Sequence, residues 1–326
     1  MSKRKKLWSL MFVVLLAFSL MLTGCGGNGQ SSSGSDSDEV LDYPNRPITA
    51  ICPWSAGGSS DIAFRAYMSY MSQELGVDIN VQNITGGDGD VGYSAALAAE
   101  PDGYTLVMVN YDILSNEAKG ITDTSYKDFA MINMFTIQDV TLVTHADYGW
   151  KTFEDFRQAA LAAKEKGETL KIGVTGFWLH AAGMMAKEAG ISDAVTLVPF
   201  SGSSDQVAEL LGKHVHAVTT STTAVLPHLQ SGTMITLGTM GTERDPDFPD
   251  VPTFREMGYD VVIAGFRAVA THKDVDPAIL EILREAGKKA YDNPEFQKWA
   301  DDAKAYQVYL DHEETVKYME NLAPKV

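Results

Sequence analysis

Residues 48–109 alternate between short apolar runs rich in β-branched residues and amphipathic stretches. The run Ile48–Pro53 is followed by a glycine-rich turn and by an amphipathic stretch that ends at Leu75, which predicts a strand, a turn and a helix. Strands separated by helices at this spacing form parallel sheets, in which the turns after the strands share the carboxyl edge where ligands bind. The unit continues with strands predicted at 78–82 and 104–109, a second glycine-rich turn at 86–92 and a helix at 93–99.

A second series of the same kind begins at the apolar run 140–144 and predicts a second α/β domain. The strand-like segment 260–270 is then expected to return to the first domain. Two crossings between domains predict two lobes joined by a hinge, with a ligand-binding cleft between them. We assign residues 43–142 and 265–326 to the first lobe and residues 143–264 to the second. The second series comprises helices at 152–166, 181–189 and 205–211 and strands at 170–174, 196–199 and 216–219, and helices at 277–291 and 294–303 close the first lobe.

The N-terminal pattern predicts export from the cytoplasm. Four cations at residues 3–6 precede the apolar stretch Leu7–Leu22, which is short for a membrane span, so residues 1–24 are predicted to be a secretory signal peptide. The tetrapeptide Leu22-Thr23-Gly24-Cys25 resembles the lipobox of bacterial lipoproteins, which implies that Cys25 is diacylated and begins the mature chain. An uncleaved N-terminal anchor is the alternative. Residues 25–42 are rich in glycine, serine and acidic residues and are expected to form a flexible tether.

Composition narrows the possible partners. The formal net charge is −17, and it becomes −21 when the four cations of residues 3–6 are removed with the signal peptide. Such a charge excludes nucleic acid as a partner and requires any anion site to rely on local donors. Cys52 is the only cysteine beyond the tether, so no intramolecular disulfide is expected. No second apolar run is long enough to span a bilayer, which leaves Cys25 as the expected membrane anchor.

The first glycine-rich turn is the main candidate for binding an anion. Gly57 and Gly58 allow close approach of the backbone, and the amides that follow open a helix whose positive end favours negative charge. Asp61 is better interpreted as a cap of that helix than as a ligand contact. A tight turn that binds nothing is the alternative. The candidate ligand-binding residues here are Ala56, Gly57, Gly58, Ser59, Ser60 and Asp61.

Five patterns follow one another along the chain, namely Tyr43-Pro-Asn-Arg-Pro-Ile48, the turn Pro53–Asp61, Pro101-Asp-Gly-Tyr-Thr-Leu106, Val198-Pro-Phe-Ser-Gly202 and Pro249–Gly258. In this order they resemble the Bug-type substrate-binding proteins of tripartite tricarboxylate transporters, over nearly the entire mature chain. The resemblance implies a two-lobed type II periplasmic-binding-protein fold that closes like a Venus flytrap on a small organic acid. Such acids are commonly di- or tricarboxylates and sometimes amino acids or aromatic acids. It also implies that both glycine turns grip one ligand carboxylate through backbone amides, small hydroxyls and water.

The second glycine turn departs from that family. The family usually has Pro-Gly-Ala-Gly-Gly where this chain has Thr85-Gly86-Gly87-Asp88-Gly89. Gly86, Gly87 and Asp88 are candidate binding residues, and a carboxylate at Asp88 would repel a di- or tricarboxylate or receive a cationic group such as an ammonium. An aspartate that forms the turn and points to solvent is the alternative.

Further candidates lie in the second lobe. The segment Gly176-Phe177-Trp178 stands where the family tends to have a Gly-Ser-type turn, so its two aromatic side chains could stack on a ligand or fill the core. Thr220 and Ser221 replace an Asp-Asn pair and could donate to a ligand or cap a helix. Phe200 completes the candidate set. Together with Asp88, the aromatic pair favours a monocarboxylate, an amino acid or an aromatic acid over a citrate-like ligand.

Catalysis is not expected. Neither glycine turn continues into Gly-Lys-Ser/Thr and no Gly-x-Ser-x-Gly elbow occurs, so no catalytic residue or cofactor is predicted. His214 and His216 could form a metal pair, but a solvated strand end is the preferred interpretation and no metal is predicted. The expected function is that of an extracytoplasmic, monomeric solute-binding lipoprotein that delivers a small carboxylate to multi-span permease subunits. A ligand-sensing ectodomain of a signalling system is the alternative, because one fold serves both.

Overall fold

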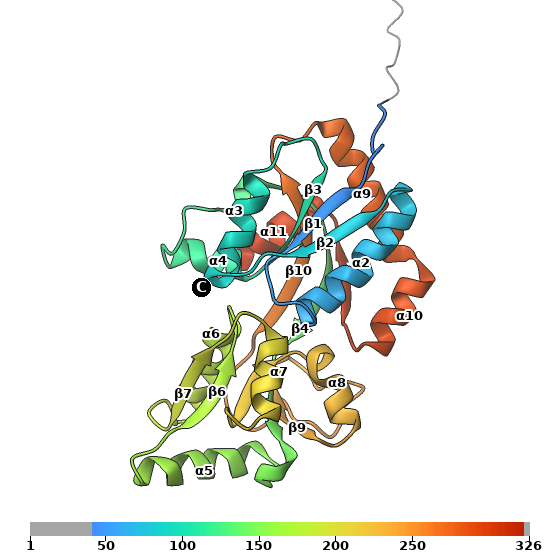
Figure 1. Cartoon of the computed structure of the whole chain (residues 1–326). Coiled ribbons are helices and arrows are strands. Elements are labelled where there is room, and N and C mark those ends of the chain that lie inside the picture. The colour runs from blue at the N-terminus through green and yellow to red at the C-terminus, as the bar shows by residue number, and fades with distance from the viewer. Residues whose placement is uncertain (1–40, 323–326) are drawn as a thin grey trace, which may run out of the picture. The chain divides into compact units, whose positions relative to one another are not determined.

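Two β-sheets organise the part of the chain that the computed structural model describes, which is residues 41–322 without the side chains of residues 138 and 139 (Figure 1). Each sheet is covered by helices, so the described chain consists of two α/β lobes. The predicted signal peptide, Cys25 and nearly all of the predicted tether lie outside the described residues. None of the described helices is both long and apolar enough to cross a lipid bilayer.

The first lobe contains a mixed six-stranded sheet. Its strands are β1 (Ile48–Cys52), β2 (Ile79–Asn83), β3 (Thr105–Asn110), β4 (Phe129–Asp139), β10 (Ala264–His272) and β11 (Gln307–Leu310). They lie in the order β11-β4-β10-β3-β1-β2, and β1 pairs in parallel with both β2 and β3. Because of this pairing, the turns that follow β1, β2 and β3 meet at one edge of the sheet, as the sequence predicted for the two glycine-rich turns.

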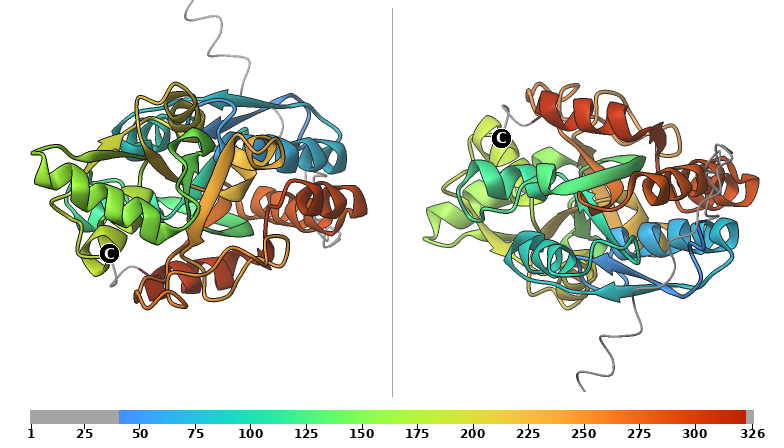
Figure 2. Two further views of the ribbon diagram at one scale, coloured as in Figure 1. Left: turned by 90° about the horizontal axis from the view of Figure 1, so that it is seen from below. Right: turned by 90° about the horizontal axis from the view of Figure 1, so that it is seen from above.

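Six helices cover the first sheet on both faces (Figures 1 and 2). They are α2 (Ser59–Leu75), α3 (Asp90–Leu97), α4 (Asp112–Ala118), α9 (Pro277–Asp292), α10 (Pro294–Asp302) and α11 (His312–Leu322). A hydrophobic core lies on each face of this sheet, and the strand β4 contributes to both. Ile132 and Phe135 pack with α2 and α9, whereas Met131 and Met134 belong to the core on the other face. Tyr67 ties the first of these cores together, with its hydroxyl 2.6 Å from the carbonyl oxygen of Gly287.

The second lobe contains a five-stranded sheet. Its strands are β5 (Thr141–His145), β6 (Leu170–Val174), β7 (Val195–Pro199), β8 (Ala217–Thr220) and β9 (Met234–Thr239), in the order β7-β6-β8-β5-β9. Its helices are α5 (Phe153–Glu165), α6 (Trp178–Glu188), α7 (Ser203–Leu211) and α8 (Thr222–Gln230). The strand β6 runs parallel to β7 and β8, so the turns after these strands again share one edge.

The chain passes between the two sheets twice. The strand β4 ends in the first sheet at Asp139 and β5 begins in the second at Thr141, while β10 brings the chain back at Ala264. These positions lie beside the lobe limits predicted at 142 and 265, and the assignment of whole segments to lobes stays a prediction. Two such connections are the arrangement in which lobes rotate about a hinge.

Local signals set several helix starts. The Thr152 hydroxyl accepts a hydrogen bond from the Asp155 amide at 3.1 Å, and the Asp155 carboxylate accepts one from the Thr152 amide at 2.9 Å, which forms a capping box for α5. Asp276 caps α9 immediately before Pro277, where a proline is well tolerated. Other boundaries differ from the prediction, and the most consequential is α6, which begins at Trp178 rather than Ala181. The aromatic pair therefore lies at the start of a helix.

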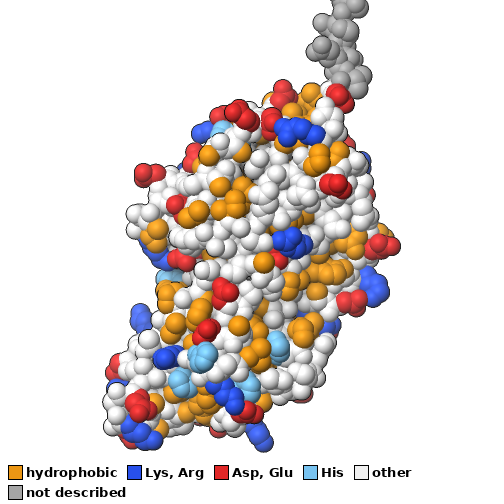
Figure 3. Space-filling view, in the orientation of Figure 1, with side chains coloured by type: hydrophobic (Ala, Val, Ile, Leu, Met, Phe, Trp, Pro, Cys, Tyr) orange, Lys and Arg blue, Asp and Glu red, His pale blue; other side chains and the backbone are white. Residues whose placement is uncertain are grey.

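Strands β4, β9 and β11 were not predicted. The strand β4 pairs with β10 and β11, both of which lie far along the chain. Its sequence, with Asn133 and Thr136 among apolar residues, has no clean alternation, so long-range pairing rather than local pattern made it a strand. On the face drawn in Figure 3, acidic and basic side chains are interspersed instead of forming one patch, which agrees with a net charge that serves solubility.

Candidate ligand-binding site

A cavity lies between the two lobes, and we call it the binding cavity. It is bounded by the carboxyl ends of β1, β3, β6 and β7 and by β10. The first lobe lines it with Trp54, Ser59, Ser60, Asn110, Asp112, Phe266 and Arg267. The second lobe lines it with Thr175, Phe177, Trp178, Gly202 and Ser203. This is the place where ligands bind in open α/β folds.

Arg267 forms the positive pole of the binding cavity. It lies within β10 and is only 2 % exposed, because neighbouring strands and α2 surround it. Its Nη2 donates to Ser59 Oγ at 3.0 Å and its Nε to Ser60 Oγ at 3.3 Å, but it forms no ion pair with any carboxylate whose side chain the structure describes. Burial lowers the pKa of the guanidinium to about 9, which leaves it charged at neutral pH. A buried cation without a counter-ion is unfavourable, so an anion fits beside it.

Asp112 forms the acidic pole. It is the first residue of α4, is 3 % exposed, and its Oδ2 accepts a hydrogen bond from Asn110 Nδ2 at 2.8 Å. The backbone amide of Phe177 in the second lobe also donates to this carboxylate. Burial raises the pKa of the Asp112 carboxyl to about 8, and the negative charge of Asp88 adds to the shift. The binding cavity therefore holds one basic and one acidic side chain, and the acidic one is largely protonated at neutral pH.

Aromatic side chains form the walls between the poles. Trp54, Phe177, Trp178 and Phe266 all line the binding cavity and are at most 5 % exposed. The indole Nε1 atoms of Trp54 and Trp178 are buried and have no hydrogen-bond partner among the residues that the structure describes. Buried donors are almost always satisfied, so these two indoles offer hydrogen bonds to a bound molecule or to water.

The two lobes contact each other around the binding cavity. The amide of Ser59 donates to Ser203 Oγ at 2.8 Å, and Ser55 Oγ donates to Asp205 Oδ2 at 2.8 Å. Three glycines allow this approach, because a Cβ atom at any of them would lie too close to the opposite lobe. It would lie 2.9 Å from Ser203 Oγ at Gly58, 2.7 Å from Ser55 Cβ at Gly202, and 2.5 Å from Asp112 Oδ1 at Gly176. The described structure is thus the closed state of the two lobes.

The first glycine turn contributes to the site differently from the prediction. Of its six candidate residues only Ser59 and Ser60 line the binding cavity, and their hydroxyls bind Arg267. The Gly57 amide donates to Asp61 Oδ2 at 2.9 Å and the Ser59 amide to Ser203, so both amides are used within the protein. Ala56 and Gly57 are exposed.

Gly58 and Asp61 hold this turn together. Gly58 has a φ of −77°, which any residue can adopt. Glycine is needed here because the absence of a Cβ atom lets Ser203 approach. Asp61 lies in the first turn of α2, where its Oδ1 binds Arg65 Nε and Asn83 Nδ2, each at 2.8 Å. With Gly57 bound to the other oxygen, the Asp61 carboxylate is occupied and lies outside the binding cavity.

The second glycine turn lies outside the lining of the binding cavity. Gly86 precedes a single 3₁₀ turn, Gly87–Gly89, in which Asp88 adopts a left-handed φ of 50°. The Asp88 side chain is exposed, and Asn116 Nδ2 donates to the carbonyl oxygens of Gly87 and Asp88 at 3.3 and 3.0 Å. The premise that Asp88 faces the ligand is therefore wrong for this closed structure. The carboxylate in the cavity is Asp112, which the sequence did not single out.

The second-lobe candidates fall into two groups. Phe177 and Trp178 line the binding cavity, and Gly176 packs directly against Asp112. Phe200 instead packs on Gly173 within the second lobe, and its carbonyl oxygen accepts a hydrogen bond from Thr175 Oγ1 at 2.6 Å. Thr220 and Ser221 are buried away from the cavity lining, with hydroxyls that lack a partner among the described residues.

Arg267 was detectable in the sequence, although it was missed. It interrupts an apolar strand, Ala-Gly-Phe-Arg-Ala-Val-Ala from Ala264 to Ala270, and an arginine inside a buried strand needs a partner. Asp112 and Asn110 carry no comparable signal. They become site residues only because the second lobe closes over the end of β3.

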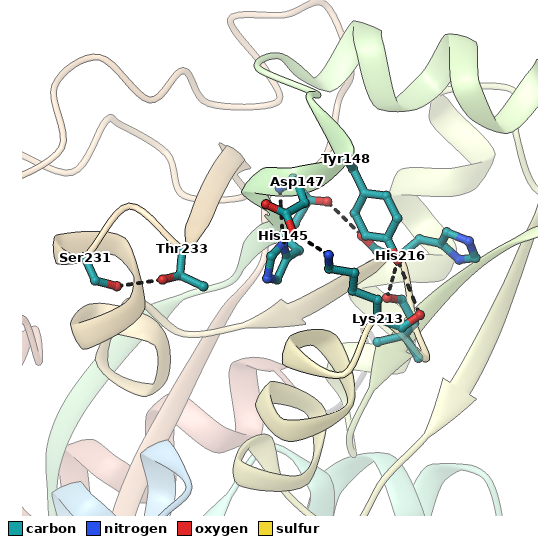
Figure 4. Close-up of polar contacts among 9 residues, drawn as sticks. His145, Asp147, Tyr148, Lys213, His216, Ser231 and Thr233 are labelled. Atoms are coloured by element: carbon teal, nitrogen blue, oxygen red, sulfur yellow. Dashed lines mark hydrogen bonds and ion pairs between the residues drawn. The ribbon is translucent and has the colours of Figure 1, made fainter.

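His214 and His216 of the second lobe have separate partners, and Figure 4 shows His216 beside Tyr148. His214 Nδ1 lies 3.0 Å from Glu209 Oε2, whereas His216 Nδ1 accepts the Lys171 amide at 2.9 Å and its ring packs against Tyr148. Among the described residues, no group of three or more His, Cys, Asp or Glu side chains is placed to hold a metal ion.

Comparison with known proteins gives the family. The model of the TctC family, tripartite tricarboxylate transporter family receptor, matches residues 63–325. BugT of Bordetella pertussis is 31 % identical over 252 residues, which cover 74 % of this chain and 75 % of BugT. A solved periplasmic transporter superposes with a TM-score of 0.79 at 26 % identity, covering 86 % of this chain and 95 % of the other.

MatC from Rhodopseudomonas palustris, solved with bound malate, has the same fold. It superposes with a TM-score of 0.73 at 23 % identity, covering 81 % of this chain and 90 % of the MatC chain. These likenesses confirm the two-lobed periplasmic-binding-protein fold predicted from the sequence. The proteins of this family are solute-binding receptors and not enzymes. The chain belongs to the receptors of the tripartite tricarboxylate transporter family, as a member of the Bug type.

Proposed function

We propose that this protein is an extracytoplasmic receptor that closes on one small organic carboxylate and delivers it to the multi-span permease of a tripartite tricarboxylate-type transporter. The observation that carries the proposal is Arg267, a buried guanidinium without a carboxylate partner among the described side chains, at the wall of the binding cavity. A ligand carboxylate beside Arg267 supplies the missing counter-ion. Malate bound to the similar MatC protein supports a carboxylate as ligand.

The proposed cycle uses no chemistry on the ligand. In the open state the carboxylate meets Arg267, Ser59 and Ser60 on the first lobe. Closure then brings Ser203 onto the Ser59 amide and places Phe177 and Trp178 over the bound molecule. Removing water strengthens the charge interaction, because the effective dielectric constant falls. The closed receptor is the form that the permease receives.

A panel of ligands tests this function. Purified protein is heated with malate, adipate, citrate, benzoate or each standard L-amino acid, and hits are titrated by calorimetry. A ligand that binds only the folded state at 100 times its Kd stabilises that state by about 2.7 kcal/mol, which raises the melting midpoint by several degrees. If no carboxylate of the panel raises the midpoint, the proposed function is wrong.

We further propose that Cys25 carries the lipid anchor, with residues 1–24 removed and residues 25–42 acting as the tether. Cys25→Ser expressed in a bacterial host is expected to move the protein from the membrane pellet to the soluble extracytoplasmic fraction, because the polar tether has almost no membrane affinity of its own. Cys52→Ala is the control, since Cys52 is buried in the folded part and is expected to leave the protein in the pellet. Sedimentation of Cys25→Ser with membranes would contradict the anchor.

A further inference from the structure

Among the residues whose side chains the structure describes, Arg267 and Asp112 are the only ionisable ones that line the binding cavity, and their charged forms have opposite signs. Arg267 enters from β10 and Asp112 from the start of α4, and no ion pair joins them although both face the same enclosed space. The remaining lining residues are neutral. When Asp112 has lost its proton, the cavity is electrically balanced, and its two charges are available to two different groups of one bound molecule.

The surroundings of Asp112 favour a cation as its partner. Asn110 Nδ2 and the Phe177 amide already donate to the carboxylate, and hydrogen bonds of this kind stabilise its ionised form. What the carboxylate lacks is a nearby positive charge. Lys119 lowers the pKa of Asp112 only slightly, and the negative charge of Asp88 raises it. The phenols of Tyr93 and Tyr111, which also lie near Asp112, carry no charge at neutral pH, since burial raises the pKa of each.

We propose that the ligand is a zwitterionic α-amino acid, whose carboxylate binds Arg267 with Ser59 and Ser60 and whose ammonium binds Asp112. This inference rests on the proposed function and names the ligand class for the same cavity. The side chain of the amino acid is uncharged, because it lies against Trp54, Phe177, Trp178 and Phe266, and no other described residue of the lining carries a charge. A dicarboxylate brings a second negative charge against Asp112, which disfavours it.

Matched ligands and a matched pair of variants test the assignment. The uncharged standard L-amino acids are titrated calorimetrically at pH 8, together with the 2-hydroxy acids that have the same side chains. The 2-hydroxy acid is expected to bind at least about 30-fold more weakly than its amino acid, because it leaves Asp112 without a cation. Asp112→Asn is expected to lower the affinity for the amino acid by a similar factor. The same variant is expected to change the affinity for the 2-hydroxy acid by less than about threefold.

Asp88→Asn is the control variant. Asp88 lies on the neighbouring turn, is exposed, and has a left-handed φ that asparagine tolerates, so its replacement removes a nearby negative charge without touching the cavity lining. The amino-acid affinity is expected to change by less than about threefold. Folding of Asp112→Asn is checked by its melting midpoint without ligand, which is expected to be unchanged or higher at pH 8 because a buried charge has been removed.

The pH dependence gives an independent readout. Below its pKa of about 8, Asp112 must lose a proton before it receives an ammonium. Affinity for the amino acid is therefore expected to rise between pH 6 and 8, by up to about tenfold per pH unit, and this rise is expected to vanish in Asp112→Asn. An Asp112 that instead donated its proton to a second ligand carboxylate would make binding weaken as the pH rises.

The outcomes separate this inference from the proposed function. If malate or adipate binds and no uncharged amino acid does, the receptor function stands and the zwitterion assignment is wrong. Equal affinity for an amino acid and its 2-hydroxy analogue, or an amino-acid affinity unchanged by Asp112→Asn, overturns the assignment as well. If neither amino acids nor the other carboxylates bind, both proposals fail.

Discussion

Arg267→Met is expected to weaken ligand binding severely, with a loss of affinity of at least about 30-fold for any carboxylate that the unmodified protein binds. The guanidinium is 2 % exposed and forms no ion pair with a described carboxylate, so the bound anion is the partner for its charge. Removing one member of a buried, hydrogen-bonded charge pair costs about 2–5 kcal/mol or more, which corresponds to this loss. Calorimetric titration with the best ligand of the panel measures it.

The same substitution is expected to leave the ligand-free fold intact or to stabilise it. Methionine fills much of the same space without a charge that must be kept out of water, and replacement of buried ionic groups by apolar ones is often neutral or stabilising. Arg284→Met is the control, because Arg284 is also partly buried but lies on α9 away from the binding cavity, where its Nε donates to the Met131 carbonyl at 3.3 Å. Full affinity in Arg267→Met, or an equal loss in Arg284→Met, would show that Arg267 does not hold the ligand.

Gly202→Ala is expected to prevent complete closure and to weaken ligand binding between about 10- and 100-fold. The added Cβ would lie 2.7 Å from Ser55 Cβ and 2.9 Å from the Ser55 amide nitrogen on the opposite lobe, and overpacking of this kind costs about 1–3 kcal/mol. Gly202 has a φ of −178°, an extended backbone that alanine adopts, so the second lobe itself is expected to fold normally. The strain is present only when the lobes meet.

Small-angle scattering and calorimetry together check this prediction. Saturating ligand is expected to reduce the radius of gyration of the unmodified protein and to reduce it less in Gly202→Ala. Gly183→Ala is the control, because Gly183 lies within α6 and a Cβ there would meet no atom within 4 Å. Ligand-induced compaction and affinity in Gly202→Ala equal to those of the unmodified protein would mean that the closed contact between Gly202 and Ser55 is not needed for binding.

Much of the first lobe could be predicted because its signals are local. The run Ile48–Pro53, the turn after it and the amphipathic stretch to Leu75 became β1, a turn and α2 nearly as expected. Hydrophobic periodicity reports on such neighbouring residues directly. The serines Ser59 and Ser60 reached the binding cavity for the same reason, since a helix that starts after a glycine turn at the carboxyl edge points its first residues there.

The sequence by itself determined the two series of α/β units and the Bug-type family. It offered the aromatic pair Phe177 and Trp178 as a candidate part of the site, and the lipid anchor at Cys25 stays a prediction. Tertiary structure alone decided which charges face the ligand. Arg267 reaches Ser59 across 208 residues of chain, and Ser203 reaches the Ser59 amide across 144. Asp112 becomes a site residue only where the second lobe closes on it, and Asp88 lies exposed at the surface, which is one of the two alternatives that the sequence left open. The physical reason is that the binding cavity forms between segments far apart in sequence, whose positions depend on strand pairing and lobe closure rather than on local propensity.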